Sequence, residues 1–212
     1  MALNSTKCCL QLDGRAYAVQ QVTRTFIAVD IGEAVRSALA DVIQRMAQEL
    51  PGLRWVDPQG IHLTLAFLGD LTDERLLAAM QAAQAAAHQV SPFACRHSHL
   101  GVFDSLQHAR VIWMGIDEPS GSLQQLHRLL NRELEHRNFA VEKRPFSPHL
   151  TLARVKMHLK PDEQNRLRPF LMETKATATA SIDRLCVMKS ELLRSGAKYT
   201  HLQDFQLGAQ HG

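Results

Sequence analysis

Apolar residues recur with two different periods along this chain, and the period changes several times. Residues 25–31 are rich in branched and aromatic side chains, which is typical of a strand. Residues 33–50 place their apolar side chains at helical spacing, and the pattern ends at Pro51 and Gly52. A second helical pattern at 73–88 is preceded by Thr72, a suitable N-terminal cap. The first third of the chain therefore predicts both strands and helices.

The same criteria assign the rest of the chain. Helices are predicted at 122–137 and 161–171, and further strands at 53–56, 62–69, 93–102, 111–116, 149–155, 178–193 and 199–205. Gly196 is expected as the turn residue of a hairpin between the last two strands. This order predicts an α+β fold built from two comparable halves.

Each half carries the five letters HLTLA, which begin at His62 and again at His149. Side chains i and i+2 of a strand share one face, so each histidine projects together with Thr64 or Thr151 while the leucines project into a core. Internal duplication is the simplest cause. It predicts two related lobes that each contribute one strand to a shared cleft, where four polar side chains converge.

A pair of imidazoles facing one cavity is suited to phosphodiester chemistry. With an ordinary pKa of roughly 6.5, one imidazole can act as a general base while the other acts as a general acid near neutral pH. Threonine hydroxyls can donate to the non-bridging phosphate oxygens. A single His-x-Thr is weak evidence, since buried histidines are often only hydrogen-bonded parts of a core. Core packing gives no reason to repeat both residues at the same offset.

Metal binding by histidines is the alternative interpretation. His62 and His149 could be two ligands, but neither motif brings a carboxylate or thiol at ligand spacing, and zinc requires three or four protein ligands. His97 and His99 also resemble a ligand pair, yet on a strand without further partners they are expected to form a surface face. We therefore expect no metal.

Composition narrows the class of protein. The chain has 212 residues with 45% hydrophobic and 21% charged content, as in a soluble globular protein, and no run long enough to span a membrane. A net charge of +3 permits a polyanionic ligand without requiring one. No secretion signal is recognised, so a cytoplasmic location is expected. The cysteines lack CxxC spacing and are expected to be reduced thiols without a role: Cys8, Cys9, Cys95 and Cys186.

The two motifs carry a family resemblance. HLTLAFLG and PHLTLAR resemble the paired His-x-Thr motifs of the 2H phosphoesterase superfamily, in particular its bacterial and archaeal RNA 2′,3′-cyclic phosphodiesterase branch, historically called 2′-5′ RNA ligase. RTFIAVDI, LRWVDPQGIHLTLAFLGD, ARVIWMGI, RPFSPHLTLAR and MKSELLRSGAKYTHL follow in the family's order, and the likeness covers residues 24–207.

The resemblance implies a fold and a domain organisation. We expect two pseudo-symmetric lobes, each an antiparallel-rich sheet with helices outside, that enclose a central cleft. Residues 24–207 would form this single bilobed domain, with 1–23 as a flexible N-terminal extension whose deletion leaves activity unchanged and 208–212 as a C-terminal tail.

The resemblance also implies a reaction. The substrate would be an RNA end with a 2′,3′-cyclic phosphate, opened by water to a 2′-phosphate without a cofactor. His62 matches the general acid that protonates the departing 3′ oxygen, and His149 matches the general base that activates water. Thr64 and Thr151 would hold the phosphate oxygens.

Further contacts with the substrate are expected around these four residues. Arg154 matches another phosphate contact, although five residues after His149 it falls on the opposite face of an ideal strand and needs a twist, a bulge or a strand end to reach the site. The aromatic candidates for stacking on a base are Phe26, Phe67 and Tyr199. Neither GxGxxG nor GxxxxGK[ST] occurs, so no nucleotide-binding loop of those kinds is expected.

The motifs leave several activities open. The same histidines could cleave and reversibly join 2′-5′ linkages, or open a small cyclic nucleotide phosphate, because the phosphorus chemistry is shared. A module that binds RNA ends without catalysis is a third alternative, and the intact histidines and threonines argue against it. We expect RNA ends as partners, no membrane, no obligate protein partner and a monomer.

Overall fold

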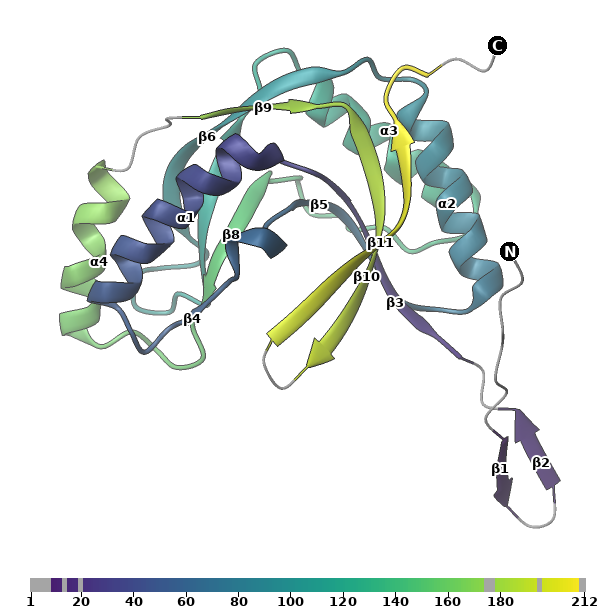
Figure 1. Cartoon of the computed structure of the whole chain (residues 1–212), viewed down its shortest axis with the longest axis horizontal. Coiled ribbons are helices and arrows are strands. Elements are labelled where there is room, and N and C mark those ends of the chain that lie inside the picture. Colours follow the sequence, from purple (N-terminus) through teal and green to yellow (C-terminus); the bar gives the residue numbers. More distant parts are fainter. Residues whose placement is uncertain (1–8, 13–14, 19–20, 174–177, 194–195, 210–212) are drawn as a thin grey trace.

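Two antiparallel sheets organise the fold in this computed structural model, which describes residues 9–12, 15–18, 21–173, 178–193 and 196–209 (Figure 1). The first sheet has the order β11 (Gly196–Gln206), β10 (Arg184–Leu193), β3 (Thr23–Val29) and β5 (Leu63–Leu71). The second has the order β4 (Arg54–Trp55), β8 (His149–Arg154), β7 (Val111–Asp117), β6 (Phe93–Val102) and β9 (Thr179–Ile182). Every neighbouring pair of strands is antiparallel.

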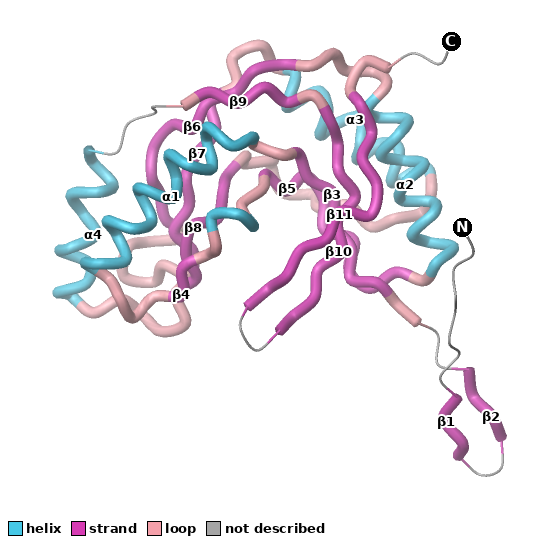
Figure 2. The backbone as a smooth tube through the Cα atoms, viewed as in Figure 1, coloured by secondary structure: helices cyan, strands magenta, loops and turns pink. Residues whose placement is uncertain are grey.

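Helices pack in two pairs, one pair for each sheet (Figure 2). Helices α1 (Gly32–Glu49) and α4 (Pro161–Glu173) lie side by side against β9 and β6 of the second sheet. Helix α2 (Asp73–Ala87) packs on the first sheet and against α3 (Ser122–His136). No helix in the described part of the chain is long and apolar enough to cross a membrane.

The two halves exchange their last strands. The first half runs β3, α1, β5, α2 and β6, and the second runs β7, α3, β8, α4 and β10, with β4 and β9 as additional short strands. Strand β6 nevertheless pairs with β7 in the second sheet, and β10 pairs with β3 in the first. The predicted α+β order of two comparable halves is confirmed, but neither sheet is made by one half alone.

Most predicted elements appear close to their expected positions. Strand β6 has the predicted bounds, and Thr72 caps α2 by accepting a hydrogen bond from the Arg75 backbone N–H at 3.4 Å. The prediction of one strand over 178–193 is wrong, because the chain passes between the sheets at Asp183 and forms β9 in one and β10 in the other. Gly196 is not a turn residue but begins β11, paired with Leu193; the turn itself, 194–195, lies outside the described residues.

The N-terminal segment is described only in part. Strands β1 (Cys9–Leu12) and β2 (Arg15–Ala18) pair with each other as a two-stranded sheet. Residues 1–8, 13–14 and 19–20 lie outside the described residues, so the flexibility and dispensability of 1–23 stay predictions. The first sheet begins at Thr23, one residue before the expected domain boundary.

The leucines of both repeats are buried in one continuous core. Leu63 and Leu65 are 0% and 5% exposed, and Leu150 and Leu152 are both 0% exposed. They belong to a cluster that also contains buried side chains of the helices, such as Leu39 of α1. The predicted division of each repeat into a core face and a polar face is therefore confirmed for its apolar side.

Each repeat contains an extra residue at the same place. Strand β3 pairs with the residues on either side of Leu65, and β7 pairs with the residues on either side of Leu152, while the leucine itself has no partner. Such a β-bulge shifts the alternation of faces by one residue. The burial pattern agrees, because after Leu152 the next residue is also buried and Arg154 is exposed.

Replacing Leu152 with alanine is expected to lower the free energy of unfolding by about 2–5 kcal/mol, because the change leaves a cavity beneath the bulge. Urea denaturation followed by circular dichroism measures this. Leu192→Ala is the matched control: that side chain is 77% exposed, and its loss should change stability by no more than about 0.5 kcal/mol. Equal losses in the two variants would contradict the packing described here.

Candidate active site

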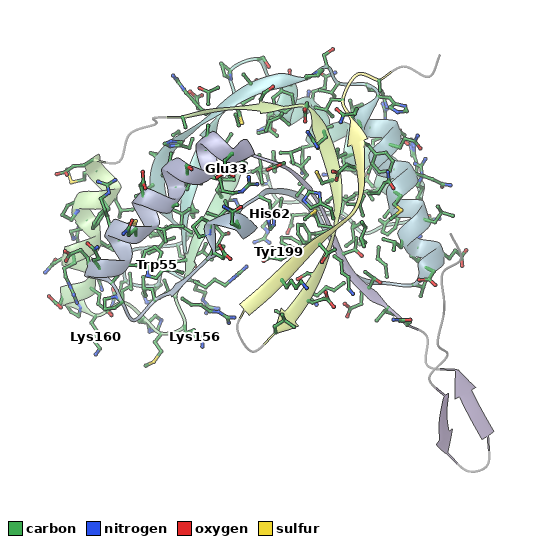
Figure 3. All side chains as sticks on the ribbon, in the orientation of Figure 1. Glu33, Trp55, His62, Lys156, Lys160 and Tyr199 are labelled. Carbon is green, nitrogen blue, oxygen red and sulfur yellow. The ribbon has the colours of Figure 1, made fainter. Side chains whose placement is uncertain are left out.

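The two histidines lie where the sheets adjoin. His62 immediately precedes β5, the edge strand of the first sheet, and His149 begins β8, which has only the two-residue β4 outside it. Strands β5 and β8 lie near each other across the boundary between the sheets. Figure 3 shows His62 beside Tyr199, near the β10–β11 hairpin.

Both imidazoles are held by the same hydrogen bond. Nδ1 of His62 lies 2.8 Å from the Gly60 carbonyl oxygen, and Nδ1 of His149 lies 2.8 Å from the Ser147 carbonyl oxygen. A carbonyl can only accept, so Nδ1 carries a hydrogen in each ring. In the neutral form this leaves Nε2 unprotonated, and Nε2 is therefore the atom that can exchange a proton with a substrate.

Local structure places each accepting carbonyl two residues before its histidine. Before His62, a short 3-10 helix, η1 (Pro58–Gly60), is capped by the Asp57 side chain, which accepts from the Gln59 N–H at 3.0 Å. Before His149, Pro148 restricts the preceding residue to extended conformations. The two segments differ in sequence and in local structure and provide the same bond.

Aromatic rings surround the His62 imidazole. Phe26 stacks on it with centroids 4.6 Å apart, and Tyr199 meets it edge-on at 4.8 Å. Phe26 is 1% exposed, so it supports the histidine and has no free face for a base, contrary to its candidacy as a stacking residue. Tyr199 is partly exposed, and Phe67 is 73% exposed with its ring 5.9 Å from Phe26. Only these two remain as stacking candidates.

His149 has aromatic support that the sequence did not reveal. Phe103 meets it edge-on at 4.8 Å, and the Trp113 ring lies 6.5 Å away. Trp113 lies directly over Gly101, where an added Cβ would come within 2.3 Å of the indole. Glycine is required here by close approach. Trp113 also pairs with Thr151 across β7 and β8. Aligning these two predicted strands in register could therefore have placed Trp113 beside the histidine strand.

The two threonines occupy equivalent positions. Thr64 pairs with Ala28 of β3, and Thr151 pairs with Trp113 of β7. Both are partly exposed, and neither side chain makes a hydrogen bond with another residue in the part of the chain that the structure describes. Their hydroxyls are free to donate to a ligand.

The bulges bring the residue five positions after each histidine onto the histidine side of its strand. Five residues after His62 stands Phe67, and five residues after His149 stands Arg154; both are exposed. An ideal strand would turn them away, and the shift at Leu65 and Leu152 reverses this. Arg154 needed a bulge to lie on the histidine face, and the fold provides one. The equivalent position of the first repeat carries the aromatic ring of Phe67.

Arg54 is a further basic residue that the sequence did not single out. It pairs directly with Arg154 across β4 and β8, and an added Cβ at Gly196 of β11 would lie 3.7 Å from its guanidinium. Like charges on opposite residues of neighbouring strands are unfavourable without a counter-ion. Within the described residues neither arginine has an ion-pair partner, so the pair is suited to an anionic ligand.

The surroundings of His62 disfavour its charged form. Burial lowers the pKa of His62, and the charges of His201 and Arg36 lower it further, against the hydrogen bond to Gly60. Arg36 itself is held by Asp30, with Nη2 and Oδ1 at 2.5 Å. These surroundings therefore favour the neutral imidazole, with Nε2 unprotonated.

The expected surface position of the other histidine pair is wrong for His97. It is 1% exposed, and its Nε2 accepts a hydrogen bond from the Ala178 N–H at 3.3 Å. His99 is exposed and meets Trp113 at 5.4 Å. In the described residues, one group of three ligand-type side chains lies close enough to hold an ion, Cys186, His201 and Asp204, and it includes neither His62 nor His149.

Comparison with known proteins identifies the family. The sequence profile of the 2′-5′ RNA ligase superfamily matches residues 34–193, and this protein therefore belongs to that superfamily. A relative from Aquifex aeolicus named RNA 2′,3′-cyclic phosphodiesterase is 26% identical over 190 residues, 89% of this chain and 99% of that protein. One of the same name from Thermus thermophilus is 31% identical over 196 residues, covering 89% and 92%. A crystal structure from Thermus thermophilus has a TM-score of 0.72 at 27% identity and covers 89% of this chain and 100% of that one.

His62 is expected to titrate below the ordinary histidine value of about 6.5, because burial opposes its charged form. The unfolded state then binds the proton more readily, so this group's contribution to stability is complete above the unfolded pKa. It is lost as the pH falls through that value toward the folded pKa. NMR titration of the ring Cε1–H signals measures the midpoint, and His62→Gln assigns the signal. A midpoint at or above the ordinary value would contradict the buried environment.

Proposed function

We propose that this protein hydrolyses RNA 2′,3′-cyclic phosphodiester ends to 2′-phosphomonoesters with its two histidines as acid and base. The observation that carries the proposal is the doubled arrangement itself: two His-x-Thr segments from two sheets, each with the same Nδ1 bond and the same bulge. Relatives named RNA 2′,3′-cyclic phosphodiesterase that cover nearly the whole chain support the choice of substrate.

In the proposed step, Nε2 of His149 accepts a proton from water as the oxygen attacks phosphorus. The bond between phosphorus and the 3′ oxygen breaks, and Nε2–H of His62 gives its proton to that oxygen. The product carries the phosphate on the 2′ oxygen. Thr64 and Thr151 donate to the non-bridging oxygens and hold the phosphorus between the two rings.

The donor role of His62 requires its charged form, which burial and the neighbouring positive charges disfavour. The negative charge of a bound phosphodiester reverses this, because an opposite charge within a few ångströms raises the pKa of an imidazole. We therefore infer that His62 takes up its proton as the substrate binds. Coupling protonation to binding prepares the acid only when a leaving group is present.

The two sides of the site have different ligand chemistry. Phe67 and Tyr199 offer aromatic surface beside His62, where stacking on a base contributes about 1–3 kcal/mol. Arg154, on the same strand as His149, is suited to the reacting phosphate, and Arg54, which pairs with it from β4, is suited to the phosphates that precede it in the RNA. We infer that the terminal base lies on the aromatic side and the preceding phosphates on the arginine side, so an RNA chain is preferred to a mononucleotide.

We also propose a monomer acting in the cytoplasm, in accord with the free thiols of Cys95 and Cys186.

A short RNA with a 2′,3′-cyclic phosphate is expected to yield only the 2′-phosphate, and to do so with EDTA present, because both proton transfers use imidazoles. His62→Ala and His149→Ala should each lower the rate by about 10²–10⁴-fold. Mass spectrometry and phosphorus NMR of the product identify the phosphate position. His136→Ala, an exposed histidine at the end of α3, is the matched control and should keep the full rate.

Near-normal turnover in either active-site variant would contradict the proposed roles. A 3′-phosphate product would contradict the direction of cleavage. Joining of 2′-5′ linkages, or faster turnover of mononucleotides than of oligonucleotides, would assign the site to a neighbouring reaction. Tight binding of the product without turnover would indicate a binding module.

Arg154→Ala is expected to lower kcat/KM by about 10- to 100-fold for oligonucleotides and mononucleotides alike, because it removes a charge-assisted hydrogen bond to the reacting phosphate. Arg54→Ala should instead affect only oligonucleotides and weaken the salt dependence of KM. Steady-state kinetics at two salt concentrations separates these effects. Arg168→Ala, an exposed arginine of α4, is the matched control. An unchanged kcat/KM in Arg154→Ala would remove this residue from the site.

A further inference from the structure

Three ligand-type side chains converge on the histidine face of the first sheet. One donor atom from each of Cys186, His201 and Asp204 lies within 4.8 Å of the other two. Nδ1 of His201 already lies 3.0 Å from Oδ1 of Asp204. Cys186 is 1% exposed, whereas His201 is exposed and Asp204 is half-buried, so the group has a buried side and a side open to solvent.

A bulge in β11 produces this convergence. His201 and Asp204 are three residues apart on β11 and would lie on opposite faces of a regular strand. The pairing of β10 with β11 shifts between Val187 and Met188, so β11 has one extra residue between His201 and Gln203. Asp204 is thereby returned to the face of His201 and pairs directly with Cys186 of β10.

We propose that Cys186, His201 and Asp204 form a site for a thiophilic divalent ion of the zinc type. A thiolate, an imidazole and a carboxylate are the three ligand types that zinc takes in proteins, and a site with three protein ligands keeps a fourth position open. Zinc bonds of about 2.0–2.3 Å place tetrahedral donors about 3.3–3.8 Å apart, so the three donor atoms must approach one another by no more than about 1.5 Å to bind the ion. Coordination releases the thiol proton and replaces the bond between His201 and Asp204.

The site adjoins the proposed acid. Cys186 packs in a small cluster with Phe26, Ala28, Met188 and Tyr199, and both aromatic rings of that cluster contact His62. A bound cation adds positive charge to the face on which His62 must carry its own. We therefore infer that a zinc-type ion bound at this site inhibits turnover. This inhibition rests on the proposed function, whereas the binding of the ion is independent of it.

Binding is tested on the full chain carrying Cys8→Ser and Cys9→Ser, called the parent protein below, so that those two thiols cannot contribute. All further variants are made in this parent protein. Zn²⁺ affinity is measured by competition with a chromophoric chelator, and Co²⁺ is added to look for thiolate-to-cobalt charge transfer in the near ultraviolet. Cys186→Ala should lower Zn²⁺ affinity by at least about 100-fold and abolish the charge-transfer band, since it removes a direct ligand. Cys95→Ala removes a second buried free cysteine among the described residues; it is the matched control and should change neither.

His201→Gln keeps the test informative if Cys186→Ala fails to fold, because that side chain is 52% exposed. It should lower Zn²⁺ affinity as well. The same Zn²⁺ affinity in the parent protein, in Cys186→Ala and in His201→Gln would overturn the site. Co²⁺ binding without a thiolate band would overturn it as well.

Turnover is then compared with Zn²⁺ and with EDTA within each protein. Zn²⁺ should inhibit turnover of the parent protein and of Cys95→Ala. This inhibition should be lost in Cys186→Ala and His201→Gln. Binding without inhibition would overturn the inhibitory effect. Absence of turnover with EDTA in every protein would instead contradict the proposed function, and the binding result would stand by itself.

Discussion

One extra residue in each repeated strand determines which side chains reach the site. Because Leu65 and Leu152 have no partner across the sheet, the face that begins with a histidine and a threonine continues with Phe67 or Arg154 instead of turning them away. Leu65 and Leu152 are buried in the core, and this burial stabilises the bulges. Removing either bulge would change the strand register and move buried apolar side chains toward solvent. The geometry of the site is thus maintained by the packing beneath it.

The site combines near-symmetry at its centre with asymmetry at its edges. Both imidazoles donate from Nδ1 to a carbonyl, and both carry a threonine two residues later. Around them, His62 contacts Phe26 and Tyr199, whereas the strand that begins at His149 ends at Arg154, which pairs with Arg54. Identical motifs thus stand in unequal surroundings, and the proposed reaction, which needs one acid and one base, makes use of this difference.

The exchange of β6 and β10 makes the two sheets depend on each other. Each sheet receives a central strand from the opposite half, and residues of both sheets and of the helices belong to one core cluster. The strand β3, which pairs with the strand that follows His62, also pairs with β10 near the other end of the chain, so the first sheet depends on contacts between residues far apart in sequence. The same exchange brings Cys186 of β10 beside residues of β3 and β11, next to His62.

The sequence by itself determined the order of elements, the cap at Thr72, and the pairing of His62 with Thr64 and His149 with Thr151, because these follow from local periodicity and capping chemistry. Only the tertiary structure decided that 178–193 divides between two sheets, that Phe103 and Trp113 support His149, and that Arg54 pairs with Arg154. Alternation along a strand indicates which residues share a face but not which sheet the strand joins. A bulge between two apolar residues also leaves no mark in that alternation, so the positions of Arg154 and Asp204 depended on strand register, which only the folded chain fixes.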